Sequence, residues 1–530
     1  MASAKVNLYC LMVASACFEY LCGRDRASER WNPAHERETY FVTLLHSRTG
    51  KTEAYAVHRD HIPDGTETRV LRKIDFFLMP LLIITFLLQY VDKVILNGAS
   101  QFGIIEDLEL YTVQGYSTGP DPEPILDLHR FSVATLIFYW GCLAGLLPAS
   151  WLAQRLPIGR YLACTVIAWG AVTMLTVVVD GYHGLLAQRF FLGVVECAVA
   201  PGFSIMIAMW WKRAERPLRY ALWYTSTGLG GHIQGSLRAR KYQYLILGAA
   251  TVVWSIVLDL LLPQNPSSAR FLKPEERLAA VERMRLEQIG IENKEFKFYQ
   301  IIELLRDPVT WILIPTTFAL HFVNGVISGF GSVIISSFGY SPFDSVLLTG
   351  AVGGGVFITC IFFGIMGTVV KDCRTWLTIG CEVCVLVGAC LMWKLNWDTQ
   401  RAGAIFEFVM CGFFAGGYMM ILALAGANIA GHTKKTFMSG LLWCAWAIRN
   451  GAVPLTVKKS EAADHYPSCF QAIIGTAAVA ICGASLLRVY LVIENKRRDH
   501  EYGQVDQTAA LQVHFEDKTD RENKLFRYSL

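Results

Sequence analysis

Long apolar stretches recur through most of the chain and constrain its fold more than any other feature. Each is roughly 20 residues long, the length that an α-helix needs to cross a hydrocarbon core of about 30 Å. About twelve stretches are present, separated by polar breaks. They occupy residues 74–96, 131–153, 159–180, 184–211, 218–237, 241–262, 309–331, 345–370, 375–395, 402–425, 437–456 and 469–493. The pattern predicts an all-α protein that crosses a membrane many times.

The overall composition agrees with this pattern. Of the 530 residues, 53% are hydrophobic and only 17% are charged, which is too apolar for a soluble protein of ordinary composition. The 15 cysteines are odd in number and most fall inside the apolar stretches, so a secreted disulfide framework is not indicated. We expect them to act as small core residues.

A polar segment divides the stretches into two groups of six, the layout of a transporter built from two similar halves. We therefore predict five parts. They are an N-terminal segment at 1–70, a first six-helix bundle at 71–263, a linker at 264–307, a second six-helix bundle at 308–495 and a C-terminal tail at 496–530.

The positions of lysine and arginine predict the orientation in the membrane, because basic residues near helix ends mark the cytoplasmic side. Basic groups flank the stretches on the side that also carries the linker; they include Arg69, Arg72, Lys73, Arg155, Arg160, Lys212, Arg213, Lys434, Lys435, Lys496, Arg497 and Arg498. Both termini and the linker should then be cytoplasmic. Arg155, Arg160, Lys434, Lys435 and the nearby His432 are candidate gating residues in the loops of this side.

Arg189 and Glu196 form the leading candidate pair inside an apolar stretch. Ionisable residues in such positions are costly and often functional. The two are seven residues apart, so they share one helix face and are separated by about 10 Å along the axis. Arg189 could attract a substrate carboxylate while Glu196 takes up and releases a proton. The alternative is an arginine that reaches the membrane surface and a glutamate that joins two helices.

Other polar residues inside the stretches are weaker candidates. Asp92 and Lys93 are adjacent and cannot face each other, so each needs a partner of its own. We assign Asp92 to proton coupling and Lys93 to gating. Four further side chains could contact substrate, although each could instead hold helices together: Tyr224, His321, Asn324 and Asn450.

Several classes of function have no support in the sequence. His58 and His61 have a metal-ligand spacing, but no third or fourth ligand is near them. A phosphate-binding glycine loop and a catalytic constellation are both absent, so we expect neither an ATP-driven pump nor an enzyme. We expect no metal, cofactor or nucleic acid, and energy supplied by an ion gradient.

Specific strings resemble one family of transporters. They are Leu71-Arg72-Lys73-Ile74-Asp75, Asp92-Lys93, Gly103 to Asp107, Arg189 to Glu196, Pro201-Gly202-Phe203, Trp211-Lys212-Arg213, Asn428 to Thr436 and Glu494 to Asp499. Together they resemble the fungal allantoate permease family of anion:cation symporters, within the major facilitator superfamily. The resemblance implies a monomer in the plasma membrane that takes up a small carboxylate, such as allantoate, nicotinate or pantothenate, with protons. Transport would proceed by alternating access between two six-helix bundles.

The chain departs from the family pattern at three places, one of which is the loop between the eighth and ninth stretches, where only part of the usual signature is present. The fifth stretch is shorter than in relatives, and an unusual proline-rich segment follows the first stretch at Gly119 to Pro124. A deletion within a membrane helix shifts its end by about 1.5 Å per residue and rotates the side chains beyond it. Two alternatives therefore stay open beside the symporter, namely a transport-inactive nutrient receptor and a non-functional transporter relative.

Overall fold

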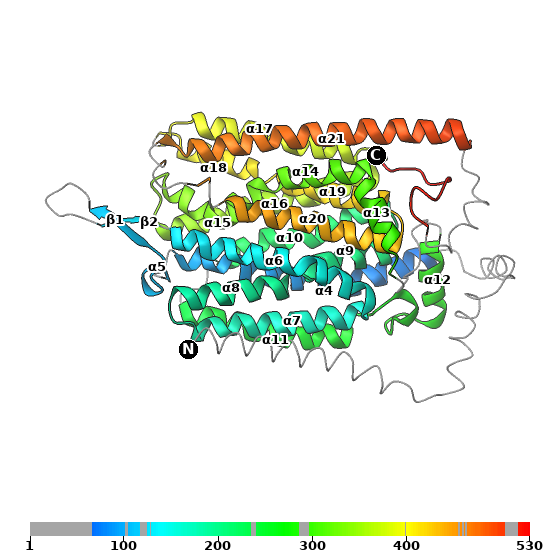
Figure 1. The fold of residues 1–530 in the computed structure, drawn as a ribbon, viewed down its shortest axis with the longest axis horizontal. Helices are drawn as coiled ribbons and strands as arrows, with labels where there is room; N and C mark the ends of the chain where they lie inside the picture. The colour runs from blue at the N-terminus through cyan, green and yellow to red at the C-terminus, as the bar shows by residue number, and fades with distance from the viewer. Residues whose placement is uncertain are drawn as a thin grey trace.

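The helices run side by side along one common direction and form an elongated bundle (Figure 1). The computed structural model describes residues 66–100, 104–116, 124–127, 129–234, 240–285, 296–397, 399–453, 456–457, 461, 464–503 and 518–530. His58 and His61 lie outside the described residues. Two short strands lie at one end of the bundle, which we call the hairpin end. The helices of the linker, which follow the first half and precede the second half in the sequence, lie at the other end, which we call the linker end.

The first half contains seven long helices and two short elements among its described residues. They are α4 (Thr66–Ser100), α5 (Ile104–Asp107), α6 (His129–Arg155), α7 (Ile158–Leu175), η1 (Thr176–Val178), α8 (Tyr182–Glu196), α9 (Val199–Trp210), α10 (Arg216–Gln234) and α11 (Arg240–Leu261). Within this half, α6 packs on α8, α7 on α11, and α4 on α10.

A linker and a second half follow. The described linker contains η2 (Pro266–Ser268), α12 (Pro274–Arg285) and α13 (Phe298–Arg306). The second half contains α14 (Pro308–Leu320), α15 (Phe322–Ser336), α16 (Pro342–Val369), α17 (Arg374–Lys394), α18 (Arg401–Cys411), α19 (Phe414–Asn428), α20 (His432–Ala452) and α21 (Pro467–Tyr502). Here α17 and α14 both pack against α21.

The predicted helical membrane fold is confirmed. Within the described residues, 10 helical segments are long and apolar enough to cross a membrane. The fifth and eleventh predicted stretches, which became α10 and α20, are not among these segments. Both helices lie between the halves, with α10 against α4 and α16 and α20 against α6 and α14. A helix surrounded by protein needs fewer apolar side chains than one that faces lipid.

Several helix bounds differ from the predicted stretches. Helix α4 begins at Thr66 instead of residue 74, and α21 continues to Tyr502 instead of ending at 493. Helix α20 spans His432–Ala452, whereas the apolar pattern indicated 437–456. Hydropathy identifies only the part of a helix that suits lipid, so polar turns at helix ends escape it. His432, Lys434 and Lys435 consequently lie in the first turn of α20 and not in a loop.

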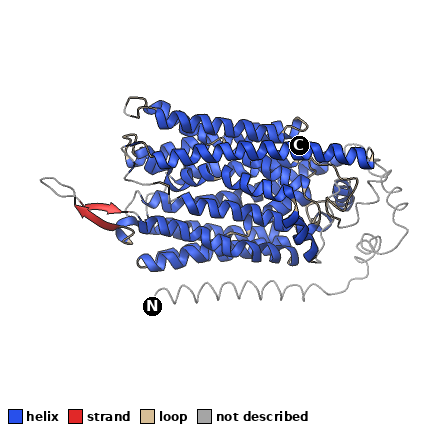
Figure 2. Cartoon of the chain, turned by 45° about the horizontal axis from the view of Figure 1, so that its top comes forward, coloured by secondary structure: helices blue, strands red, loops and turns tan. Residues whose placement is uncertain are grey.

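The hairpin end carries a small antiparallel sheet, which the sequence pattern did not predict. Strands β1 (Thr112–Tyr116) and β2 (Pro124–Asp127) pair from Thr112 opposite Asp127 to Tyr116 opposite Pro124 (Figure 2). Threonine, valine, tyrosine and isoleucine favour such extended pairing. Of the proline-rich segment noted in the sequence, Gly119 to Pro124, only Pro124 belongs to the described residues.

Helix α10 keeps the short length that the fifth stretch suggested. It contains 19 residues, which correspond to roughly 28 Å of helix and so nearly match a hydrocarbon core of about 30 Å. Its middle contacts α16 backbone to backbone, because a Cβ placed on Gly228 would lie only 2.3 Å from the carbonyl oxygen of Gly353. The two halves therefore meet closely along α10 and α16.

Candidate functional site: a central cavity between the two halves

Three spanning units are interrupted in the middle, and they are the most buried of the candidate spans. The breaks fall between α8 and α9, between α14 and α15, and between α18 and α19. The best-matching windows of these units are 78%, 83% and 83% buried, against 28–56% for the others. Broken helices are tolerated in a membrane where they are surrounded by protein or line a cavity. These units therefore mark the interior of the bundle.

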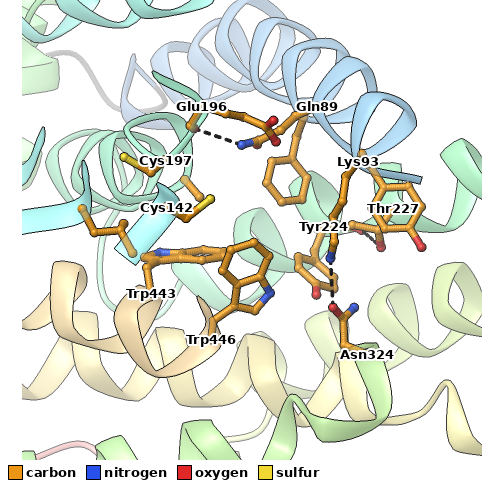
Figure 3. Close-up of a pocket in the computed structure, with 14 residues that line it drawn as sticks. Gln89, Lys93, Cys142, Glu196, Cys197, Tyr224, Thr227, Asn324, Trp443 and Trp446 are labelled. Atoms are coloured by element: carbon orange, nitrogen blue, oxygen red, sulfur yellow. Dashed lines mark hydrogen bonds between the residues drawn. The ribbon is translucent and has the colours of Figure 1, made fainter. Parts of the chain in front are cut away.

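An open cavity lies between the halves beside the first of these breaks (Figure 3), with about 560 Å³ of empty space that includes open solvent. The first half supplies most of its walls through α4, α6, α8, α9 and α10, and the second half supplies α15 and α20. The lining residues are Phe86, Gln89, Tyr90, Lys93, Cys142, Leu146, Glu196, Cys197, Ala200, Tyr224, Thr227, Asn324, Trp443 and Trp446. A second cavity of about 440 Å³ shares Tyr90, Thr227 and Asn324 with it and continues toward α16.

Lys93 brings a positive charge into this cavity. Its Nζ donates a hydrogen bond of 3.2 Å to Oδ1 of Asn324, which joins α4 of the first half to α15 of the second (Figure 3). The same Nζ lies 4.9 Å from the ring centroid of Trp446 and 5.6 Å from that of Tyr139. Aromatic faces attract a cation without neutralising it. The charge of Lys93 thus remains available to an anion in the cavity.

Glu196 is the acidic residue of the cavity lining. Its side chain is buried, and its Oε2 has no hydrogen-bond partner among the described residues. Gln89 donates to the backbone carbonyl of Glu196 at 3.2 Å. The carboxyl group lies within electrostatic range of Lys93, Asp92 and Arg189. A buried carboxyl with a free oxygen is well placed to exchange a proton.

Asp92 points away from the cavity. Its Oδ2 accepts hydrogen bonds from Nε1 of Trp169 at 2.7 Å and from Oγ1 of Thr173 at 2.9 Å, both on α7. Asp92 and Lys93 therefore have separate partners on opposite sides of α4, as their adjacency required. Asp92 lies within electrostatic range of Arg189 inside the first half.

Arg189 lies on the same helix as Glu196 but does not line the cavity. Its Nη2 donates to the hydroxyl of Tyr244 on α11 at 3.3 Å, and its Nε has no partner among the described residues. The seven-residue spacing buries both side chains. Of this pair only Glu196 lines the cavity, and the basic side chain in the lining is that of Lys93.

The remaining substrate candidates occupy different layers around the cavity. Tyr224 and Asn324 line it. His321 lies behind this layer, with its ring 3.9 Å from that of Tyr418 and neither ring nitrogen hydrogen-bonded within the described chain. Asn450 uses its amide nitrogen to bind the backbone carbonyl of Trp446 at 2.7 Å. His321 and Asn450 thus shape the second layer of the site.

The sequence reasoning missed part of the cavity wall. Gln89, Trp443 and Trp446 were not among the candidates, although all three line the cavity. Trp443 and Trp446 are three residues apart on α20, with ring centroids separated by 5.5 Å. Their spacing places them on one helix face, and this signal was available in the sequence.

The basic residues predicted to gate the linker end have different surroundings. Arg155 ends α6 and lies 4.5 Å from the ring of Trp151, and Arg160 lies in the first turn of α7. Lys434 is fully buried, and its Nζ lies 2.8 Å from Asp307, 2.8 Å from Asp520 and 2.9 Å from Glu303. His432 and Lys435 are half-buried beside it.

Hydrogen bonds join the two halves at the linker end. Arg216 donates to the carbonyl of Gly426 at 2.7 Å, and Gln154 donates to the hydroxyl of Thr433 at 2.9 Å. The backbone N–H of Leu218 donates to Oγ1 of Thr368 at 3.1 Å. Each bond connects a residue of the first half to one of the second. The structure therefore represents a state that is held together at this end.

Comparison with known proteins decides the family. The model of the Major Facilitator Superfamily matches residues 81–454, which covers the linker and most of both halves. The chain belongs to this superfamily. It is 33% identical to an uncharacterized transporter of Schizosaccharomyces pombe over 90% of this chain and 89% of that protein. It is also 31% identical to the allantoate permease of Saccharomyces cerevisiae, over 88% of this chain and 87% of the permease.

A third relative is less similar in sequence. The thiamine pathway transporter of Saccharomyces cerevisiae is 25% identical over 91% of this chain and 92% of its own length. These relatives are named as transporters or as a permease. The chain is accordingly a membrane transporter of the Major Facilitator Superfamily, and its resemblance to the allantoate permease family is confirmed.

Proposed function

We propose that this transporter takes up a small organic anion together with protons, by alternating access around the central cavity. The observation that carries the proposal is the pair of opposite charges in the cavity lining, Lys93 and Glu196. The relative named allantoate permease supports a carboxylated substrate. Allantoate, nicotinate, pantothenate and similar carboxylates are the candidates.

Charge balance gives the physical reason for coupling an anion to a proton. With Lys93 charged and Glu196 ionised, the lining side chains carry no net charge. Entry of a carboxylate alone would leave one uncompensated negative charge in a poorly solvated space, which is costly. Protonation of Glu196 removes that excess, so that the charge of Lys93 balances the charge of the substrate. Substrate and proton therefore favour each other's binding.

The cavity walls add a preference for flat or partly apolar substrates. The cavity lining that contains Lys93 also carries the aromatic side chains of Phe86, Tyr224, Trp443 and Trp446, of which Figure 3 labels the last three. Gln89, Thr227 and Asn324 supply polar groups that can orient a substrate. A compact carboxylate with a planar group fits this lining better than a long aliphatic acid or a cation.

We further propose that the linker end faces the cytoplasm of cells in which the protein lies in the plasma membrane. Basic residues gather at this end, as the membrane topology rule requires of a cytoplasmic face. The protein acts as a monomer in this proposal, because one chain supplies both walls of the cavity.

Uptake of a panel of labelled carboxylates into cells that express the full chain tests the proposed function. The panel includes allantoate, nicotinate and pantothenate, with a labelled cation as control. We expect saturable uptake of at least one carboxylate that a protonophore abolishes. Absence of uptake for all of them, with the protein inserted in the membrane, would favour the inactive relative or receptor and would reject the symporter.

A further inference from the structure

The C-terminal tail, residues 518–530, is packed into the linker end of the bundle. Thr519, Asp520, Asn523, Phe526 and Tyr528 are buried, and Phe526 is 0% exposed. A polar segment at the end of a chain is ordinarily exposed unless specific contacts hold it down. The burial of these side chains indicates a docking site in the body of the transporter.

Asp520 anchors the tail to the second half through a buried charge cluster. Its Oδ1 lies 2.8 Å from Nζ of Lys434, which is also held by Asp307 and Glu303. Its Oδ2 accepts a hydrogen bond of 2.9 Å from the hydroxyl of Tyr528, within the tail itself. A buried ammonium group requires such compensation, so the tail supplies one of the carboxylates that make the burial of Lys434 tolerable.

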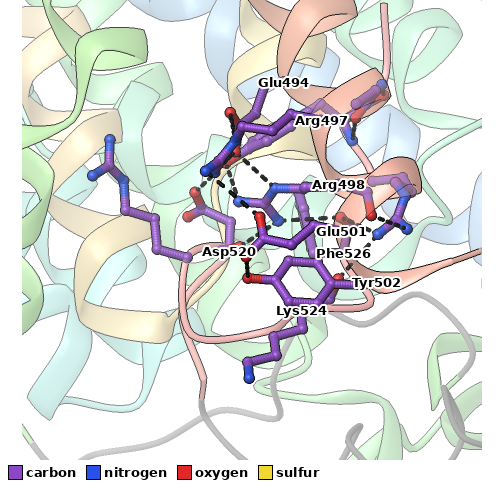
Figure 4. Close-up of polar contacts among 12 residues, drawn as sticks. Glu494, Arg497, Arg498, Glu501, Tyr502, Asp520, Lys524 and Phe526 are labelled. Carbon is purple, nitrogen blue, oxygen red and sulfur yellow. Dashed lines mark hydrogen bonds and ion pairs between the residues drawn. The ribbon is translucent and has the colours of Figure 1, made fainter.

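Two asparagines and an arginine of the second half bind the backbone of the tail. Asn428 both donates to the carbonyl of Ser529 at 2.9 Å and accepts from its N–H at 2.7 Å. Asn495 makes the same reciprocal pair with Tyr528, at 2.8 Å in both directions. Arg498 donates to the carbonyls of Asp520 at 2.9 Å and of Phe526 at 3.1 Å (Figure 4). These contacts fix the path of the tail along the second half.

The same tail also contacts the first half, at Arg213. The guanidinium carbon of Arg213, in the connection between α9 and α10, lies 4.5 Å from the ring centroid of Phe526. Nη1 of Arg213 donates to the carbonyl of Arg527 at 3.5 Å. Arg374 of the second half supports this contact by donating to the carbonyl of Arg213 at 2.7 Å and to Oγ of Ser529 at 3.2 Å.

We propose that the C-terminal tail is a latch that holds the two halves of the transporter closed at the linker end. It is attached to the second half through the contacts of Asp520, Tyr528 and Ser529. It contacts Arg213 of the first half through Phe526 and Arg527. This inference rests on the alternating-access cycle of the proposed function, in which the halves must separate at this end. The contact with Arg213 is the weaker attachment. It therefore breaks when the halves separate, and the tail moves with the second half.

Native thiols offer a test that requires neither a substrate nor a proton gradient. Cys142 and Cys197 line the central cavity, and both are buried. The full chain is placed in sealed proteoliposomes with the linker end outward and treated with a membrane-impermeant maleimide. Mass spectrometry then gives the labelling rate at each cysteine. We expect Phe526→Ala and Arg213→Ala each to raise the rate at Cys197 several-fold.

A double variant and a matched control make the test specific. Because Phe526 and Arg213 form one contact, the double variant should label no faster than the faster single variant. Arg521→Ala removes a residue of the same tail that pairs with Asp307 of the second half at 3.3 Å, and it should label at the wild-type rate.

The latch is refuted if neither single variant changes the labelling rate, or if Arg521→Ala raises it equally. Faster labelling in the Phe526 and Arg213 variants, in a chain that transports none of the tested carboxylates, would retain the latch and reject the proposed substrate class. If the chain transports a carboxylate but the Phe526 and Arg213 variants leave the labelling rate unchanged, the proposed substrate class is retained and the latch is rejected.

Discussion

At the scale of residues, the cavity combines one basic and one acidic side chain with aromatic walls. The sequence singled out Glu196, and the structure places this residue at the cavity. Its expected companion, Arg189, instead binds Tyr244 two helical turns away. Residue spacing identifies a shared helix face, but it cannot show at which level a cavity opens, because that depends on how α4 and α20 pack nearby. Lys93, which the sequence pattern assigns to gating, lines the same cavity.

Lys93→Gln should weaken substrate binding by roughly 10-fold or more, equivalent to about 1.4 kcal/mol, because it removes the positive charge of the cavity. Lys93→Arg should retain part of the affinity, since the charge is kept while its position shifts. The apparent affinity for uptake of the best carboxylate substrate provides the measurement.

Arg189→Gln is the comparison for the Lys93 variants. It should reduce the amount of folded protein, because Arg189 lies in the interior beside Asp92, and it should alter apparent affinity less than Lys93→Gln does. If Arg189→Gln loses more affinity than Lys93→Gln does, the result would indicate that Arg189 binds the substrate carboxylate and that Lys93 does not.

At the scale of elements, the two halves approach most closely where α10 crosses α16. A Cβ on Gly228 would lie 2.3 Å from the carbonyl oxygen of Gly353, and one on Gly353 would lie 2.4 Å from that of Gly228. Only glycine at both positions permits this backbone contact. The sequence revealed glycines in the fifth stretch, but their partner on α16 became visible only in the folded chain.

Gly228→Ala should destabilise the transporter by about 1–3 kcal/mol, the usual cost of forcing extra volume into a packed interface. The readout is the midpoint of thermal unfolding in detergent. Gly329→Ala is the matched control, because a Cβ at Gly329 meets nothing within 4 Å. Equal midpoints for the two variants would contradict the prediction, because they would show that α10 and α16 can move apart at Gly228 without a loss of stability.

Helix α12 of the linker is fastened to α4 by an ion pair whose strength depends on pH. Nζ of Lys73 donates to Glu276 at 2.6 Å, and the backbone N–H of Lys273 donates to the same carboxyl at 3.0 Å. These hydrogen bonds hold the pKa of Glu276 below its usual range. The stabilisation is therefore present above the ordinary glutamate pKa and is lost as pH falls through the lowered value in the folded protein.

Hydrogen exchange of α12, corrected for intrinsic rates, should accordingly become faster between neutral pH and about pH 3. Glu276→Gln keeps a side chain that can cap the helix but cannot form the ion pair. Its exchange at neutral pH should be faster than that of the wild type and should depend less on pH. A wild-type helix whose protection is unchanged in acid would contradict this attachment.

At the scale of the whole molecule, hydropathy and charge predicted the helical membrane fold, because both follow from the cost of placing polar groups in lipid. The breaks at His321 and Gly412 were not predicted, since an apolar stretch reads the same whether its helix is straight or interrupted. The docking of the C-terminal tail also escaped prediction. It depends on Lys434, Asn428 and Asn495, which come together only when the second half folds.

The most direct test of the central claim is transport by Glu196→Gln in proteoliposomes, measured in two ways on the same preparation. One assay follows accumulation of a labelled carboxylate driven by an imposed pH gradient, and the other follows exchange of labelled for unlabelled substrate without a gradient. Glutamine cannot exchange a proton but approximates a protonated glutamate. We therefore expect gradient-driven accumulation to be lost while exchange continues. Accumulation at the wild-type level in Glu196→Gln would contradict proton coupling through this residue.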